Sequence, residues 1–121
     1  MNAKQELFDI FEEMGFEYWL MHQMPADKKY PSSFFTYLTT DAPFTDYHDN
    51  KPMSISWVFM IGFYTDDPGI MDITIINLMK KLQAAGWIVE GPGEDVESDE
   101  PTHTGRRLTI ARIEYLESEG N

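Results

Sequence analysis

The sequence has no cysteine and few basic residues, since its 121 residues include 9 Lys and Arg against 21 Asp and Glu. The lack of cysteine excludes disulfide bonds, thiolate metal ligands and a cysteine nucleophile, and it is typical of a reducing compartment. No apolar run approaches the roughly 20 residues that a membrane-spanning helix needs. The first residues, MNAKQELFDIFEEM, are acidic and lack a signal-peptide pattern. We therefore expect neither a membrane partner nor a secretory leader.

The shortage of cations gives a formal net charge of −12 at pH 7. A protein that grips DNA or RNA neutralises phosphates with Lys and Arg, so this charge disfavours nucleic acid binding. In many small proteins an acidic surface simply aids solubility. Two sharper interpretations stay open: a surface past which DNA slides without binding, and a surface that imitates DNA.

Two segments have the apolar spacing of a helix. The first covers residues 4–14 and is followed by a glycine, which suits the end of a helix. The second lies between Pro68, which suits a first turn, and Gly86. Its apolar stripe consists of Met71, Ile75, Leu78, Met79 and Leu82. Ile73 and Ile76 lie beside this stripe, and we expect them to widen the buried face.

Three longer segments are predicted as strands, at residues 32–40, 54–64 and 107–116, and a short strand begins at Trp87. The clearest is 54–64, where every second residue is large and apolar. These residues are Ile55, Trp57, Phe59, Ile61 and Phe63. Residues 16–21 fit either a strand or an extension of the first helix.

The order of these elements predicts an α+β fold, an antiparallel β-sheet of about four strands with two helices packed on one face. We expect a single domain over residues 1–121, because the chain is short and no linker interrupts it. Turn residues predict long loops at about 40–53 and 90–106, and a frayed C-terminal tail is predicted at 117–121.

Catalytic or metal chemistry is weakly indicated. His48 lies within DYHDN, and His103 follows two acids in SDEPTHTGRR, so these loops would offer metal ligands if they met. That arrangement would support a small metal-dependent hydrolase, which we keep as an alternative. The sequence has no HExxH or GxSxG motif, and GPG at 91–93 is too short and too acidic to cradle a phosphate. We therefore predict no enzyme activity, no catalytic residue, no metal and no cofactor.

The segment SDEPTHTGRR, residues 98–107, is interpreted as a hinge between an acidic flexible loop and a paired strand. Gly105 permits the turn, and we expect Arg106 and Arg107 to pair with nearby carboxylates. Aromatic residues of the loop predicted at 40–53 are candidates for a protein interface, where such side chains are enriched. The candidate subunit interface is Phe44, Tyr47 and His48.

Several stretches together resemble small proteins of long-tailed bacteriophages and prophages that are encoded among the head–tail joining and tail genes. They are FFTYLTTDAPFTDYHDNKP, SWVFMIGFYTDDP, a helix closing in AAGW, and GPGEDVESDEPTHTGR, and the likeness runs from about residue 30 to 115, most of the chain. The order of helices and strands is also similar to that of tail-terminator (tail-to-head joining) proteins. The resemblance implies a non-enzymatic virion subunit that forms a hexameric ring on the tail and docks to the head connector. It leaves open whether this chain is the terminator or a neighbouring minor tail protein.

This resemblance sets the expected partners and location. The partners would be further copies of the chain, tail tube proteins and head-connector proteins, with DNA passing through without specific binding. The location would be the host cytoplasm during assembly and then the virion tail or neck. We expect the predicted acidic loop to face the lumen or the next ring, with Glu94, Asp95, Glu97, Asp99 and Glu100 as its candidate residues. A DNA-mimicking or other protein-binding inhibitor is the main alternative.

Overall fold

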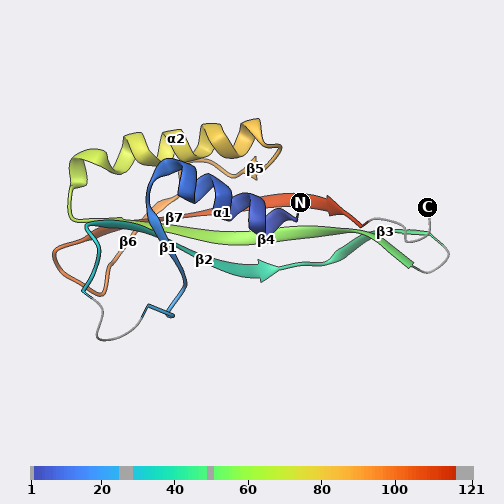
Figure 1. Ribbon diagram of the computed structural model, residues 1–121, viewed down its shortest axis with the longest axis horizontal. Helices are drawn as coiled ribbons and strands as arrows, with labels where there is room; N and C mark the ends of the chain where they lie inside the picture. The colour runs from blue at the N-terminus through green and yellow to red at the C-terminus, as the bar shows by residue number, and fades with distance from the viewer. Residues whose placement is uncertain (1, 25–28, 49–50, 117–121) are drawn as a thin grey trace.

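The computed structural model describes residues 2–24, 29–48 and 51–116, and the side chains of 45–48 and 52 are outside that description. Within these ranges the chain forms an α+β fold in which two helices cover one face of a seven-stranded sheet (Figure 1). The α+β class and the helix layer are therefore as predicted. The strand number and the all-antiparallel arrangement are corrected: the sheet is mixed, because β1 (Glu17–Leu20) runs parallel to β2 (Ser33–Asp41).

Helix α1 (Ala3–Met14) begins and ends with side-chain and glycine caps. The Asn2 side chain accepts a hydrogen bond from the Gln5 backbone N–H, and Gly15 closes the helix at a φ of 85°. That φ is in the left-handed region, where glycine is favoured because it has no Cβ. The buried residues of α1 follow the predicted spacing and are Ala3, Leu7, Ile10 and Phe11.

Helix α2 (Met71–Ala84) follows a single 3₁₀ turn, η1 (Pro68–Ile70), whose Gly69 N–H is capped by Asp67. Its buried side is formed by Met71, Thr74, Ile75, Leu78 and Leu82. The expectation that Ile73 and Ile76 widen this buried side is wrong, since they are 54% and 44% exposed. They lie on the far side of the helix axis, where the sheet cannot reach them. Neither described helix is long and apolar enough to cross a membrane.

The sheet is built around β4 (Lys51–Thr65), which has antiparallel neighbours on both sides. It pairs with β2 from Ser33↔Thr65 to Asp41↔Val58, and with β7 (Thr104–Tyr115) from Thr65↔Thr104 to Ser54↔Tyr115. The strand order is β1-β2-β4-β7-β5, with β5 (Ile88–Val89) on the outer edge of β7. Alternation along β4 therefore decides which side chains meet the helices.

Two short strands lie where long loops were predicted at about 40–53 and 90–106. In the first, β3 (Phe44–His48) forms an antiparallel pair with the beginning of β4, and residues 49–50 lie outside the described ranges. In the second, β6 (Glu94–Val96) pairs with β7. Both pairings satisfy backbone groups that the long strands β4 and β7 would otherwise leave open. The predicted tail at 117–121 lies outside the described residues.

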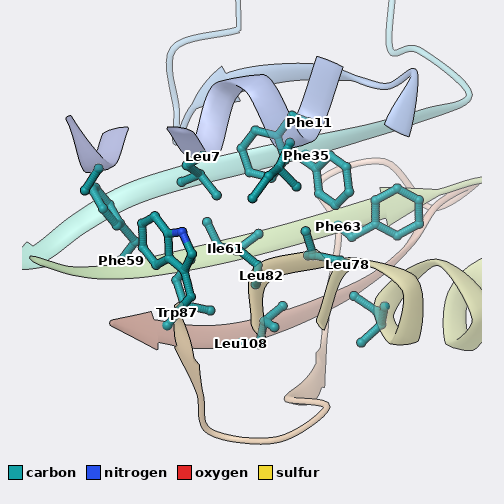
Figure 2. Packing of buried hydrophobic residues seen from close by; sticks show 14 of the residues in the cluster. Leu7, Phe11, Phe35, Phe59, Ile61, Phe63, Leu78, Leu82, Trp87 and Leu108 are labelled. Carbon is teal, nitrogen blue, oxygen red and sulfur yellow. The ribbon is translucent and has the colours of Figure 1, made fainter. Parts of the chain in front are cut away.

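The core fills the space between the helix layer and the sheet (Figure 2). Phe59, Ile61 and Phe63 point from β4 toward the helices and are fully buried. The rings of Phe11 and Phe35 stack with centroids 4.4 Å apart, so α1 is fixed over β2. The remaining buried partners include Leu7, Met71, Ile75, Leu78, Leu82, Trp87, Leu108 and Ile110.

Candidate functional site: an aromatic and acidic hollow on the open face of the sheet

The face of the sheet that turns away from the helices forms the floor of the candidate site. Because β4 alternates, the residues between its core positions point to this open face, and Tyr64 is one of them. Its neighbours across the strands are Phe34 on β2 and Gly105 on β7. At this end of β4 the sheet therefore places an aromatic pair beside a residue with no side chain.

The Tyr64 ring lies flat against two glycines. A Cβ on Gly105 would lie 2.6 Å from Tyr64 Cε1, and a Cβ on Gly62 would lie 2.5 Å from Thr36 Oγ1 and 2.9 Å from Tyr64 Cε2. Such separations are shorter than van der Waals contact, so neither position tolerates a side chain without displacement. The glycines are thus required by the position of the ring.

Four rings form an aromatic cluster over this floor, and they are Tyr30, Phe34, Tyr64 and His103. Phe34 stacks on Tyr64 with centroids 5.4 Å apart and meets the edge of Tyr30, also at 5.4 Å. The His103 ring lies 5.4 Å from the Tyr30 ring and 6.2 Å from the Phe34 ring. These are the edge-to-face and offset distances that aromatic pairs favour.

His103 fastens the SDEPTHTGRR segment to this cluster. Its Nε2 lies 2.8 Å from the Pro31 carbonyl oxygen, and its Nδ1 lies 2.9 Å from the Thr102 hydroxyl. A carbonyl oxygen only accepts, so Nε2 donates its hydrogen to Pro31, while Nδ1 and the Thr102 hydroxyl form a second hydrogen bond. Both ring nitrogens are engaged, which makes His103 a structural residue in this arrangement.

The described side chains do not form the alternative metal site that would use His48 and His103. The His48 side chain lies outside the description, and its backbone pairs with Lys51 at the far end of β4 from His103. Across residues 2–24, 29–48 and 51–116, no group of three or more His, Asp or Glu side chains is arranged to hold a metal ion.

The aromatic cluster forms one wall of a hollow of about 810 Å³. Trp19 from β1 and Met21 continue this wall, and Thr36 lies on the floor. The opposite wall is acidic because the segment after β6 folds over the open face, and its acids are Glu97, Asp99 and Glu100. The volume is in the range of ligand-binding clefts.

Neighbouring charges have different effects on the pKa values of Tyr64 and Tyr30, the two tyrosines of the hollow. Burial raises the pKa of Tyr64, and Asp99 adds to this, whereas Arg107 opposes it. Burial also raises the pKa of Tyr30, and there the carboxylates of Asp99 and Glu100 both act in the same direction. Two carboxylates of the acidic segment thus act on Tyr30, whereas Tyr64 is acted on by both a carboxylate and Arg107.

The two arginines of SDEPTHTGRR differ in their partners. Arg106 forms the predicted ion pairs, at 2.8 Å to Asp72 on α2 and 3.1 Å to Asp95 on β6. Arg107 points to the open face, is half-buried in the hollow, and forms no ion pair with any described carboxylate. The expectation of pairing is thus correct for Arg106, whereas Arg107, which alternation along β7 turns to the other face, forms none of the ion pairs seen among the described residues.

The structure separates the two predicted sets of site residues. The acids Glu94, Asp95, Glu97, Asp99 and Glu100 are all exposed near the end of β4 that contains Tyr64. We expected the acidic segment to be a free loop, but Glu94 and Asp95 lie on the paired strand β6. Strand β3, which begins at Phe44, lies at the other end of the sheet beyond the helix layer (Figure 1), and the Phe44 residue is 52% exposed. Tyr47 and His48 follow it on β3.

Sequence reasoning did not identify the aromatic part of the hollow. Trp19, Tyr30, Phe34 and Tyr64 come from segments that are far apart in the chain, and only the sheet brings them together. One local signal was present: Gly62 and Gly105 interrupt otherwise bulky strands, which indicates a close approach by another group.

No protein-family model matches the sequence, and no curated protein matches it significantly. The function proposed below therefore depends on the motifs described above and on the geometry of the chain.

Proposed function

We propose that this chain is a structural component of a phage tail or neck, a ring-forming tail terminator or a minor tail protein at the head–tail junction. It acts by fitting against copies of itself and against other virion proteins, and it transforms no substrate. The resemblance of the four sequence stretches to tail proteins supports this proposal, and the surface of the fold supports an assembly role.

The observation that carries this proposal is a pair of apolar surfaces on opposite sides of the molecule. On the outer side of α2, Ile73 and Ile76 are exposed one helical turn apart. On the open face of the sheet, Ile88 and Ile113 are exposed near each other, because Ile88 pairs with Ala111 on β7. Large apolar side chains gathered on a surface are typical of protein contacts.

Two different surfaces on one subunit suit a head-to-tail contact. If the outer side of α2 docks on the open sheet face of the next copy, each subunit uses one surface on each side, and rotation closes a ring. Electrostatics permits this contact, because the one acid of α2 is Asp72 and it is already paired with Arg106. The acidic groups that give the chain its charge of −12 lie mainly elsewhere.

The acidic segment has a separate part in the proposal. Glu94, Glu97, Asp99 and Glu100 are exposed, and we place them toward the lumen of the ring or toward the next ring. A cationic lumen would bind phosphates and release counterions, whereas an acidic lumen leaves DNA free to move. The location proposed for the chain is thus the virion tail or neck.

The experiment uses two variants that each remove one surface. Ile73→Asp with Ile76→Asp charges the helix side, and Ile88→Asp with Ile113→Asp charges the sheet side. All four positions are exposed, so folding should be preserved. The wild type is expected to form rings on tail tubes, visible by electron microscopy, and to self-associate at high concentration in sedimentation velocity.

Mixing the variants gives the decisive reading. Each variant alone should remain monomeric, whereas an equimolar mixture should form a one-to-one dimer through the two intact surfaces. A monomeric mixture would show that this contact does not exist. Rings that bind away from the end of the tail tube would argue for a minor tail protein rather than a terminator.

A DNA-mimicking inhibitor is the second candidate, and one observation favours it. Glu94 and Asp95 lie on a paired strand, where carboxylates have the fixed spacing that imitation of phosphates requires. Asp95 is neutralised by Arg106, however, which weakens this reading. Capture of a DNA-binding enzyme by the purified chain, with release by added DNA, would support it over the tail protein.

A further inference from the structure

We propose that the hollow on the open sheet face binds a lysine or arginine side chain presented by a segment of a partner protein. This inference goes beyond the tail-subunit proposal and does not depend on ring formation. It rests on the shape of the hollow, its aromatic wall and the charges around it.

The shape and the aromatic wall suit a peptide segment rather than a single ion. The hollow has a volume of about 810 Å³, which exceeds what one side chain fills. Trp19, Tyr30 and Tyr64 are half-buried and line it, and Phe34, only 3% exposed, supports them from below. Aromatic faces attract Lys and Arg, most strongly where water is partly excluded.

The charged residues that line the hollow favour a positively charged guest. Asp66, Glu97, Asp99 and Glu100 line the hollow, whereas its described cations are Lys29 and Arg107. Glu97, Asp99 and Glu100 take part in no ion pair with the described residues, so their carboxylates are available. A guest cation would therefore gain charge-assisted hydrogen bonds.

The charged groups near Tyr64 and Tyr30 indicate where in the hollow the charge of the guest would lie. Arg107 acts on Tyr64 and would repel a second cation there. Tyr30, Asp99 and Glu100 line the hollow together, and both carboxylates raise the pKa of Tyr30. The guest charge is thus placed between the Tyr30 ring and these two carboxylates, with the apolar part of the segment over Trp19 and Met21.

The probe is a blocked tripeptide, Leu-Arg-Leu, with two matched controls: the same peptide with citrulline, which is neutral and nearly the same shape, and Leu-Glu-Leu. Titrations of the full chain are followed by NMR shifts of the aromatic ring protons. The arginine peptide is expected to give saturable shifts at Tyr30 and Tyr64, with the citrulline peptide at least about tenfold weaker. Equal binding of all three peptides, or no saturation up to about 10 mM, would overturn the inference.

Variants locate the site. Asp99→Asn and Glu100→Gln should each weaken the arginine peptide by about three- to fivefold, since each removes an exposed charge partner. Glu90→Gln is the matched control, because this exposed acid does not line the hollow. If Glu90→Gln weakens binding as much as Asp99→Asn, the peptide responds only to the overall charge and the inference is wrong.

Discussion

Glu6 on α1 and Arg112 on β7 form an ion pair, with Glu6 Oε1 3.2 Å from Arg112 Nε. The same oxygen accepts a hydrogen bond from Trp87 Nε1 at 2.9 Å, and Arg112 Nη1 donates to the Ala85 carbonyl at 2.6 Å. One carboxylate thus connects the first helix, the last strand and the turn after α2. It lies at the edge of the core, where its side chain is 20% exposed.

Glu6→Gln should lower the free energy of unfolding by about 1–2 kcal/mol, because it removes the charge opposite a partly buried guanidinium and weakens the bond to Trp87. Urea unfolding followed by tryptophan fluorescence measures this. Glu13→Gln is the matched control on the same helix, since Glu13 pairs with Lys81 at the exposed surface and should cost at most about 0.5 kcal/mol. Equal costs for the two variants would refute a special role for Glu6.

Gly105→Ala should destabilise the fold by roughly 1–3 kcal/mol, because the new Cβ would lie 2.6 Å from the Tyr64 ring. A double-mutant cycle with Tyr64→Ala tests the cause, since removal of the ring should make Gly105→Ala cheaper. The measurement is again urea unfolding. An unchanged cost of Gly105→Ala in the Tyr64→Ala background would mean that the ring is not what excludes a side chain.

Stability should fall at alkaline pH in part through Tyr64. Its pKa in the folded chain is raised above the ordinary 10.0, mainly by burial, so the unfolded chain releases this proton first. The contribution of the neutral phenol is complete below pH 10 and is lost as the pH rises through the folded pKa. Tyr64→Phe should therefore lose less stability than the wild type between about pH 9 and about pH 11. Identical slopes for the two proteins would contradict the raised pKa.

Phe44→Ser separates an interface role from a core role. Phe44 is 52% exposed at the start of β3, so the free energy of unfolding should change by at most about 0.5 kcal/mol. Assembly on tail tubes should nevertheless be reduced, as judged by electron microscopy. Phe63→Ser, at a fully buried position, is the opposite case and should unfold the chain. Normal assembly with Phe44→Ser would remove Phe44 from the candidate interface.

Charge reversal tests the position proposed for the acidic segment. Glu94→Lys with Glu97→Lys should slow DNA ejection from assembled particles, because cations at the lumen bind phosphates. Asp9→Lys with Glu12→Lys makes the same change in charge on exposed positions of α1 and should have little effect. Ejection rates that are normal in both variants would show that the segment does not line the DNA path.

The spacing of apolar residues predicted most of the helices and strands, because each of them has one side that faces the core. The alternation in 54–64 identified the central strand, and the stripe on α2 gave its buried side correctly at Ile75 and Leu78. The same reasoning failed at Ile73 and Ile76, which lie on the far side of the helix from this stripe and are exposed. Their apolar composition alone does not show which side of the helix they occupy.

The short strands were missed for a different reason. Residues 44–48 and 94–96 contain the polar and acidic residues typical of loops, and they pair only because β4 and β7 offer open edges. The sequence also did not reveal that β1 runs parallel to β2, since a four-residue strand has the same alternation in either direction. The hollow depends on the long-range pairing of β1, β2, β4 and β7, so its aromatic wall could not be predicted from the sequence.

The central place of β4 between β2 and β7 has a consequence for how the chain is made. At the ribosome, Lys51–Thr65 emerges with its β2 partner already synthesised, but its other edge stays open until Thr104–Tyr115 follows. Such distant pairing closes slowly, and an open strand edge attracts other chains meanwhile. Newly made molecules should therefore pass through a brief period of dependence on chaperones, which ends only when the last strand joins the sheet.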